Sequence, residues 1–347
     1  MRTPRVLLVL GLLLAALPAS ADKNDLALWK LGQVNVNPDG TIGLPGVSIG
    51  ADAETQFRSL VSELGVVLAP RLLMPADTLG YSGFQFSAEM SFTTINTNQT
   101  TSPWRNALER HGQIKDDGNP DTTIPGVFTT IGVFARKGIW LPMPSFEVGA
   151  GALNVLETNM FALQVYAKMA IHEGFHGWPL PSVAVRGAAS RLVGSSNLDL
   201  TIASLDFSLS YSFGLGGTIN LQPYAGYNLL WIIPRSQVLD ANPTCDAYVT
   251  SANPAASCPD PRNPGGATIA PGATELNSNF VFRNQDNILR HRIFFGLKLK
   301  FHVIALIADY AYIPGGSSSD ANGPGGAKIR DQSKDQHQAS VSLALDF

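Results

Sequence analysis

Two histidines in the segment 172–176, which reads HEGFH, have the spacing of a metal site. Histidines four residues apart, with a glutamate beside the first, bind zinc in metalloproteases when they lie on one face of a helix. Gly174 and Pro179 instead predict a turn here, because both residue types interrupt a helix. We therefore expect no metal site in this segment, and we identify none elsewhere in the chain.

His291 and His337 are further candidates for chemistry. A hydrolytic enzyme with a serine nucleophile needs that serine close to a histidine, together with a polar partner that orients the ring. Neither histidine has a serine suitably placed on a common polar face of its strand. The sequence also contains no P-loop, no dinucleotide-binding glycine motif and no CxxCH haem motif. We expect a protein that is not an enzyme and that has no cofactor.

Residues 1–21 predict a cleaved signal peptide. Arg2 and Arg5 precede an apolar run over residues 6–17, which is shorter than the roughly 20 residues that a membrane-spanning helix requires. The small residues Ala19 and Ala21 suit cleavage by signal peptidase. The sequence therefore predicts export.

Cys245 and Cys258 are the two cysteines of the chain, and they lie in a segment rich in proline, asparagine and serine. Two cysteines at this separation with no nearby histidine do not make a zinc site. Export favours a disulfide between them. In the chain-entropy model such a bond contributes about 3 kcal/mol, so it would hold a local loop and would not build a core.

The composition combines few charges with many apolar residues. Charged residues make up 15% of the chain and hydrophobic residues 45%, whereas roughly a quarter of a soluble domain is charged. No run of about 18 apolar residues follows the signal peptide, so the sequence excludes membrane helices. The formal net charge of −3 gives no support for nucleic-acid binding. A sheet that shows alternate faces to lipid and to water fits these observations.

The clearest strand covers residues 335–347, where five apolar residues alternate with polar ones. Alternation with period two is the pattern of a strand with one apolar face. In the strand predicted after residue 198 the apolar residues change parity, which predicts a bulge near Ala203. The other predicted strands cover residues 84–92, 127–136, 146–155, 161–171, 183–193, 198–213, 219–231, 292–301 and 304–312.

This pattern resembles that of the bacterial outer-membrane β-barrels, a porin-like class within which no specific family is identified. Their last strand alternates as residues 335–347 do and ends in an aromatic residue, here Phe347. The resemblance implies that the barrel-assembly machinery reads this strand. It also implies an all-β fold, a transmembrane antiparallel up-and-down barrel in the outer membrane. We expect about 12 strands, with 10 and 14 as alternatives.

The polar positions of these strands carry charges of both signs, which the barrel would place in its lumen. A 12-stranded barrel leaves room for a narrow aqueous path. The charges either pair and plug the lumen or leave a small, charge-filtered pore. The lumen-lining candidates are Glu89, Arg136, Lys168, Arg186, Asp206, Arg292, Lys298, Lys300 and Asp309, together with Asp346.

Aromatic residues fall near the ends of the predicted strands. In a membrane barrel they would form girdles at the depth of the lipid headgroups; in a soluble sandwich they would be ordinary core residues. The membrane-interface candidates are Trp140, Trp178, Trp231, Tyr310, Tyr312 and Phe347.

Barrels of this class have short periplasmic turns and long outer loops. With the last strand running to a periplasmic end, the long polar segments 96–125, 234–287 and 314–334 all fall on the outer side. Residues 66–74 and 41–50 are the candidates for additional N-terminal strands, and a helix is expected near Phe57 and Leu64 from their spacing. We therefore divide the chain into a signal peptide over 1–21, a periplasmic N-terminal segment with a possible helix or plug over 22–64, and an outer-membrane barrel over 65–347.

Two functions remain open. The first is a porin-like channel or passive transporter for small solutes, with the solute unknown. The alternative is a plugged structural or surface-interaction barrel whose long outer loop over 234–287 binds a partner. The expected partners of either are outer-membrane lipid and the assembly machinery, with no nucleic acid.

Overall fold

The computed structural model describes residues 22–36, 42–98, 100–113, 115, 117–140, 145–173, 180–215, 218–240, 258–259, 268–269, 279–320 and 323–347. The predicted signal peptide, Cys245, His176 and Trp178 lie outside the described residues. Within the described residues, no helix is both long and apolar enough to cross a membrane.

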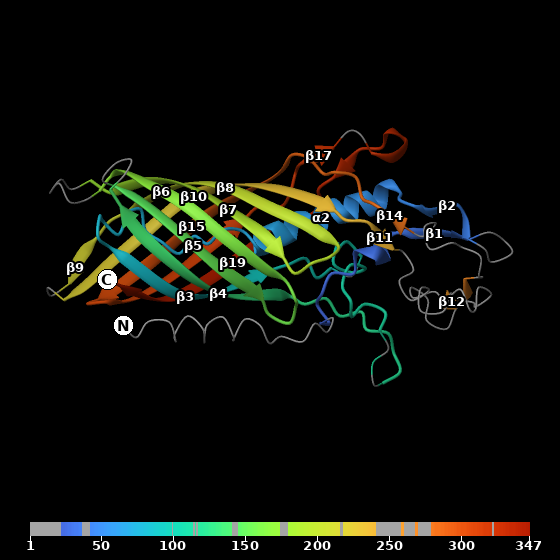
Figure 1. Ribbon diagram of the computed structural model, residues 1–347, viewed down its shortest axis with the longest axis horizontal. Helices are drawn as coiled ribbons and strands as arrows, with labels where there is room; N and C mark the ends of the chain where they lie inside the picture. The colour runs from blue at the N-terminus through green and yellow to red at the C-terminus, as the bar shows by residue number, and fades with distance from the viewer. Residues whose placement is uncertain are drawn as a thin grey trace, which may run out of the picture.

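Ten antiparallel strands form a closed barrel (Figure 1). Each strand pairs with two neighbours, and the pairing of β10 with β15 completes the ring. The ten predicted strands are confirmed in position, except that the one predicted over 198–213 ends at Ser210 and Phe213 belongs to a separate short strand. The wall strands are β3 (Phe84–Thr94), β4 (Val127–Ile139), β5 (Phe146–Val155), β6 (Phe161–His172), β7 (Ser182–Val193), β8 (Leu198–Ser210), β10 (Ile219–Ser236), β15 (Ile288–Phe301), β16 (Ile304–Ile313) and β19 (Gln336–Asp346).

Several short elements lie outside the ten wall strands. A three-residue strand, β9 (Phe213–Leu215), adds to β10. The remaining elements are η1 (Leu28–Leu31), β1 (Gln33–Val36), β2 (Ile42–Ser48), α2 (Ala51–Val67), β11 (Leu239–Asp240), β12 (Cys258–Pro259), β13 (Thr268–Ile269), β14 (Asn279–Phe280), β17 (Ser319–Asp320), η4 (Pro324–Gly326) and β18 (Ile329–Arg330).

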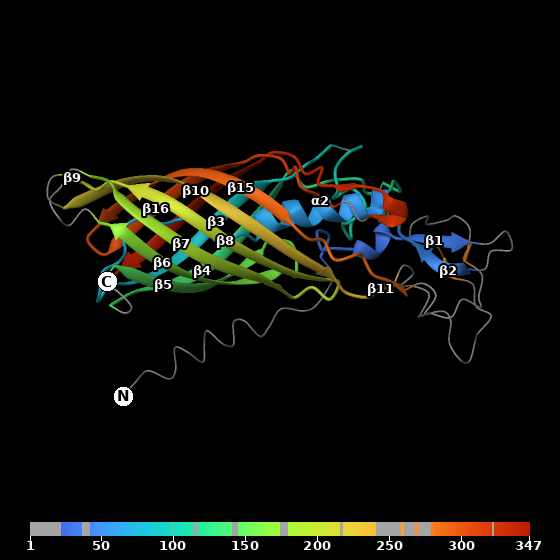
Figure 2. The same ribbon diagram turned by 90° about the horizontal axis from the view of Figure 1, so that it is seen from above.

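The barrel has two different ends. At the turn end, β4, β6, β8, β15 and β19 finish, and the chain ends at Phe347; β15 reverses into β16 through the predicted tight turn, where His302 adopts a φ of 54°. At the loop end, β3, β5, β7, β10 and β16 finish, and the three long connections begin there. Figure 2 shows α2 and the β1–β2 hairpin at the loop end, opposite the C-terminus.

The expected count of 12 strands is wrong, and the barrel has the alternative count of 10. Residues 66–74 do not join the wall: α2 ends at Val67, and residues 68–80 run on through the barrel interior without strand structure. Pro70 and Pro75 disfavour a strand here, since proline has no N–H to give to a strand ladder, although β10 accommodates Pro223 and Pro234. Residues 42–48, from the other candidate strand, pair with β1 in a separate two-stranded sheet.

The position of the N-terminal segment also differs from expectation. We expected residues 22–64 on the same side as the C-terminus, but residues 22–36 bind connections at the loop end. The first wall strand begins at Phe84, so the expected barrel boundary at residue 65 falls inside the lumen. The spacing of Phe57 and Leu64 does mark a helix, as expected, and this helix is buried inside the loop half of the barrel.

No bulge occurs at Ala203. β8 pairs in an unbroken register with both β7 and β10. Leu198, Leu200 and Ile202 therefore point into the lumen, on the same parity as Asp206. The inward face changes from apolar to polar along one strand because α2 fills the loop half of the lumen.

Candidate functional site: the occupied lumen

The apolar face of α2 packs against the inward side chains of the wall. Phe57, Leu60 and Leu64 are fully buried, in one cluster with residues of β8 and β10. Burial of such side chains stabilises a fold by about 1.5–3 kcal/mol each. The ring of Phe57 stacks on Phe282 with centroids 4.4 Å apart. Gly65 meets Ile232 so closely that an added Cβ would lie 2.5 Å from it.

The polar face of α2 holds the connections at the loop end. The Arg58 guanidinium donates to Oε1 of Gln285 and to Oγ of Ser318, each at 3.0 Å. Ser62 donates to Asp331 at 2.7 Å and accepts from Arg290. A helix with both faces occupied in this way is wedged between the wall and the loops.

Glu63 is the acidic anchor of this helix. Its carboxylate accepts from the indole Nε1 of Trp104 at 2.7 Å and from the backbone nitrogens of Asn96 and Lys334 at 3.1 and 3.2 Å. Burial raises the pKa of Glu63 above its usual range, although these donors and Arg290 oppose the shift. Two of these donors, Asn96 and Trp104, lie in the β3–β4 connection, and Lys334 lies in the β16–β19 connection. One carboxylate therefore joins the helix to two connections at the loop end.

Residues 68–80, which we call the strap, continue from α2 to the turn end inside the lumen. An extended segment without strand partners leaves its carbonyl groups unsatisfied, and burying them costs free energy unless other donors are found. Wall side chains supply those donors. The carbonyls of Leu68 and Ala69 accept from Gln164, that of Pro70 from Arg292, that of Arg71 from Arg186, that of Leu73 from Arg136, and those of Pro75 and Asp77 from Lys168.

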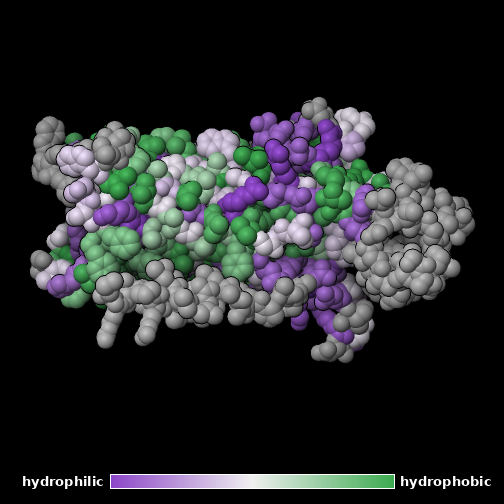
Figure 3. Space-filling model, viewed as in Figure 1, coloured by the Kyte–Doolittle hydropathy of each residue, from purple (hydrophilic) through white to green (hydrophobic). Residues whose placement is uncertain are grey.

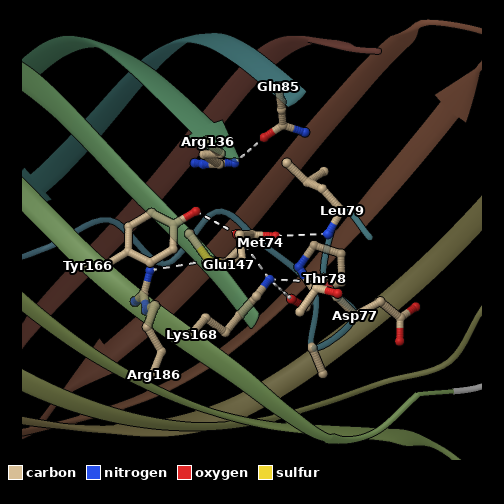
Figure 4. A network of polar contacts seen from close by, with 12 residues as sticks. Met74, Asp77, Thr78, Leu79, Gln85, Arg136, Glu147, Tyr166, Lys168 and Arg186 are labelled. Atoms are coloured by element: carbon tan, nitrogen blue, oxygen red, sulfur yellow. Dashed lines mark hydrogen bonds and ion pairs between the residues drawn. The ribbon is translucent and has the colours of Figure 1, made fainter. Parts of the chain in front are cut away.

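Wall carboxylates and hydroxyls bind the N–H groups of the strap. Glu173 accepts from the backbone nitrogen of Thr78 at 2.7 Å and from its hydroxyl at 2.6 Å. Glu147 accepts from Leu79 at 3.0 Å, as Figure 4 shows. The wall thus binds both kinds of backbone group on the strap, as a neighbouring strand would.

Three of the cations that hold the strap are themselves paired with acids on neighbouring strands. Arg136 pairs with Glu89 at 2.5 Å and Lys168 with Glu147 at 3.3 Å, and Arg186 forms a close pair with Asp206. All six side chains are buried. Removal of one partner from such a pair is strongly destabilising, because it leaves a buried charge uncompensated.

The structure places the predicted lumen residues on the inward side of the wall. Arg292 donates to Asn228 and Gln338 as well as to the strap. Lys298 and Lys300 both pair with Asp346 near the turn end, where Lys300 is partly exposed. Asp309 is buried with its Oδ2 atom unpaired in the described residues.

A polar cavity remains beside the strap at the turn end. Its volume is about 50 Å³, and its lining includes Asp77, Gln85, Glu147, Lys168 and Lys298. Roughly 10–15 Å³ of such volume suffices for one water molecule, so this space accommodates a few waters. The cavity is far smaller than the 300–1,000 Å³ of a ligand pocket.

Aromatic rings lie over glycines on neighbouring strands at several inward positions. Gly149 on β5 pairs with Tyr166 on β6, and an added Cβ there would meet the ring at 2.2 Å. Gly151 has the same relation to Phe134 on β4, at 2.1 Å. The absence of a side chain at these glycines leaves room for the rings, and the hydroxyl of Tyr166 donates to Glu147 at 2.6 Å.

Comparisons with solved structures give matches of low identity and low TM-score. Neisserial surface protein A (NspA) aligns at 10% identity and a TM-score of 0.28, over 76% of this chain and 97% of NspA. The outer membrane protein OprG from Pseudomonas aeruginosa aligns at 11% identity and 0.28, over 79% and 99%. The translocator domain of the autotransporter NalP from Neisseria meningitidis aligns at 9% and 0.32, over 86% and 96%.

The closed antiparallel barrel is established by the strand pairing of this chain, because similarities at these TM-scores carry no argument. Identities this low concern the fold alone and say nothing of activity. No family model matches the sequence, and no curated protein matches it.

The interface aromatics of this β-barrel lie near its two ends. Trp140 and Phe347 are 56% and 67% exposed at the turn end. Trp231, Tyr310 and Tyr312 belong to the loop half of the wall. The girdle that they would form at the lipid headgroups stays a prediction. The predicted place of Trp178 in that girdle also stays a prediction.

The structure describes three of the four histidines singled out in the sequence, but only one of the two cysteines. His172 is the last residue of β6, not part of a helix, and Glu173 binds the strap. His291 and His337 are exposed on the outer face of the wall beside Tyr227 and Tyr310. The disulfide from Cys258 to Cys245 stays a prediction, since Cys245 is outside the described residues. Among the described residues, no cluster of three metal-binding side chains occurs.

The sequence reasoning missed the strap and the side chains that hold it, notably Gln164 and Glu147. Two signals pointed to them. Pro70 falls within residues 66–74 and Pro75 directly follows them, and proline weakens a strand ladder because it has no N–H. The inward parity of β5 and β6 also includes Glu147 and Gln164.

Proposed function

We propose that this protein is an outer-membrane β-barrel closed by its own N-terminal segment, and that its loop end is a surface for interaction outside the cell. The loop end faces the exterior in this proposal, and the turn end faces the periplasm. This is the plugged alternative of the two functions that the sequence leaves open.

The outer face of the wall supports membrane embedding. Leu163, Phe295 and Leu343 are 57%, 60% and 58% exposed, although each is a large apolar side chain. They belong to three different strands, and similar residues occur all round the barrel. On the face shown in Figure 3, many apolar residues lie over the barrel wall, and many hydrophilic residues lie over the loop end. A soluble monomer rarely exposes apolar area on this scale, whereas lipid requires it.

One observation carries the assignment of a closed barrel. The carbonyl groups of the strap accept hydrogen bonds from Gln164, Arg292, Arg186, Arg136 and Lys168 on four different strands. An open channel needs these side chains to face water. Here they are buried against a segment of the same chain.

Planar bilayers test the closed state directly. The refolded full chain, checked by heat-modifiable migration on gels, should give no steady conductance at moderate voltage. An unrelated open porin added to the same bilayer serves as the positive control. A steady ohmic conductance from the refolded chain would overturn the proposal.

A porin-like channel or passive transporter is the second candidate, and the polar cavity beside the strap favours it. In that case the strap must leave the turn half of the lumen. Ala76→Cys with Ser210→Cys would lock it, because the Ala76 nitrogen lies 3.1 Å from the Ser210 hydroxyl. Cys245 and Cys258 are changed to serine in both the locked and the reference chains. Solute flux into liposomes that stops on oxidation and returns on reduction supports the channel, and absence of flux in both states excludes it.

A further inference from the structure

The N-terminal segment is built into the loop end of the barrel. Leu26 forms an antiparallel bridge with Leu108 in the β3–β4 connection, and Ala27 donates to Ala107 at 2.8 Å. The ammonium group of Lys30 donates to three carbonyls of the same connection, those of Leu108, Glu109 and His111, at 3.1, 2.8 and 2.9 Å.

Two other connections at the loop end hold the same segment. Asp25 accepts from the backbone and side-chain nitrogens of Asn159, both at 2.8 Å. The carbonyl of Leu26 accepts from the side chain of Asn197 at 3.2 Å. Three connections far apart in the sequence therefore converge on residues 24–30.

From this position the chain crosses the whole barrel before the wall begins. Glu54 binds Gln285 in the connection before β15, at the loop end. Farther along, Pro70 meets Arg292, and Thr78 meets Glu173, which follows β6 at the turn end. Phe84 then starts β3 beside Phe347, to which its nitrogen donates at 2.9 Å.

The number of crossings fixes which side each end of the chain occupies. Ten antiparallel wall strands return the chain to the end at which it started. The passage through the lumen by α2 and the strap adds one further crossing. Residues 22–36 and the C-terminal Phe347 consequently lie at opposite ends of the barrel.

We infer that the barrel carries its own N-terminal segment across the outer membrane and displays residues 22–36 and 42–50 on the cell surface. The inference rests on the proposed function, in that the loop end must face outward. It adds a self-export step: after removal of the signal peptide, the new N-terminus passes to the outside and is fixed there by the loops. The interaction surface at the loop end then includes this segment as well as the long connections.

Epitope tags at three positions test the inference in intact cells. One tag lies between Asp22 and Lys23, which are both exposed. A second lies between Ser195 and Ser196 in the β7–β8 connection at the loop end, and a third between His302 and Val303 at the turn end. We expect an antibody to label the first two tags on intact cells, and the third only after the outer membrane is permeabilised.

The three tags separate two kinds of failure. If the tag at 195 is labelled and the tag at 22 is protected in a barrel that migrates as folded, the N-terminal segment is not displayed, and the inference is overturned while the proposed function survives. If the tag at 195 is protected, the loop end does not face outward, and both are overturned.

A cross-link provides a second measurement that does not depend on an inserted tag. Leu26→Cys with Leu108→Cys joins the two residues of the antiparallel bridge, in a chain whose Cys245 and Cys258 are serine. We expect a disulfide and an altered mobility on non-reducing gels of protein from intact cells. Leu26→Cys with Val303→Cys, at opposite ends of the barrel, is the matched control and should not cross-link. The opposite pattern of cross-linking contradicts the inference.

Discussion

The guanidinium of Arg292 on β15 lies 2.9 Å from the backbone carbonyl oxygen of Pro70, in the middle of the strap. The same side chain donates to Asn228 on β10 at 2.7 Å and to Gln338 on β19 at 3.3 Å. Arg292 thus connects wall strands and plug through one planar group with several donors, a role suited to arginine and not to lysine.

Arg292→Met should therefore destabilise the folded barrel. The change keeps an unbranched side chain but leaves the buried carbonyl of Pro70 and the amide oxygen of Asn228 without a donor, at a cost of about 1–3 kcal/mol for each unsatisfied group. The midpoint of urea unfolding in detergent micelles, followed by circular dichroism, measures the loss. Arg191→Met is the matched control: its pair with Asp199 is 2.8 Å long but half exposed, and exposed pairs contribute about 1 kcal/mol or less. Equal losses for the two variants would contradict the role given to Arg292.

Gly149→Ala should slow or weaken assembly of the barrel wall. The added methyl group would lie 2.2 Å from the ring of Tyr166, so either the ring or the strand must move. Overpacking of this kind costs about 1–3 kcal/mol. The fraction of compact, heat-modifiable protein after refolding measures the effect. Gly187→Ala on β7 is the control, because nothing lies within 4 Å of its added Cβ. Gly149→Ala combined with Tyr166→Ala should relieve the clash, and a double variant with no gain over Gly149→Ala would exclude the steric explanation.

The wall could be predicted from the sequence because every wall strand obeys one physical rule. Phe207 faces outward and Asp206 inward, and the same alternation identifies each of the ten strands. The contents of the lumen could not be read in this way. The strap has no period, since its hydrogen bonds go to single side chains such as Lys168, 91 positions from Asp77 in the chain.

The same limit explains the bulge that was expected and is absent. Leu200 and Asp206 share the inward parity of β8, yet one faces the apolar side of α2 and the other faces Arg186. The alternation along a strand shows which residues point into the lumen. Whether those residues are apolar or polar depends on what fills the lumen beside them. In a plugged barrel an inward leucine is therefore a sign of the plug.

The free energy of unfolding should vary with pH through Glu63. Burial raises the pKa of this carboxyl above the usual 4.5, so the folded state binds its proton more tightly than the unfolded state does. This group therefore favours the folded state most below about pH 4.5, and the favourable contribution is lost as the pH rises through the raised pKa. The loss is about 1.4 kcal/mol for each pH unit between the two pKa values.

Glu63→Gln removes this titration and isolates it. The difference in unfolding free energy between the variant and the wild type should change between pH 4.5 and 8 in favour of the variant, while the other carboxyl groups cancel in the subtraction. The variant also loses an acceptor, because its amide group must face the Lys334 nitrogen or the donors from Trp104 and Asn96. That loss is independent of pH, so it shifts the difference in unfolding free energy by the same amount at every pH and does not change how the difference varies with pH. A difference that stays constant over this range would contradict a raised pKa at Glu63.

Lys30→Gln should loosen the N-terminal segment from the loop end. The ammonium group satisfies three carbonyls of the β3–β4 connection at once, and a glutamine amide is too short to reach all three. We expect the Glu109–Arg110 region to be cleaved about tenfold faster by a glutamate-specific protease in limited proteolysis of the micellar protein, which corresponds to about 1.4 kcal/mol of local opening. Lys23→Gln removes an equal charge from an exposed position and should leave the rate unchanged. If both variants are cleaved at the wild-type rate, Lys30 does not hold this connection, and the contacts of Asp25 and Leu26 are sufficient to fix the segment.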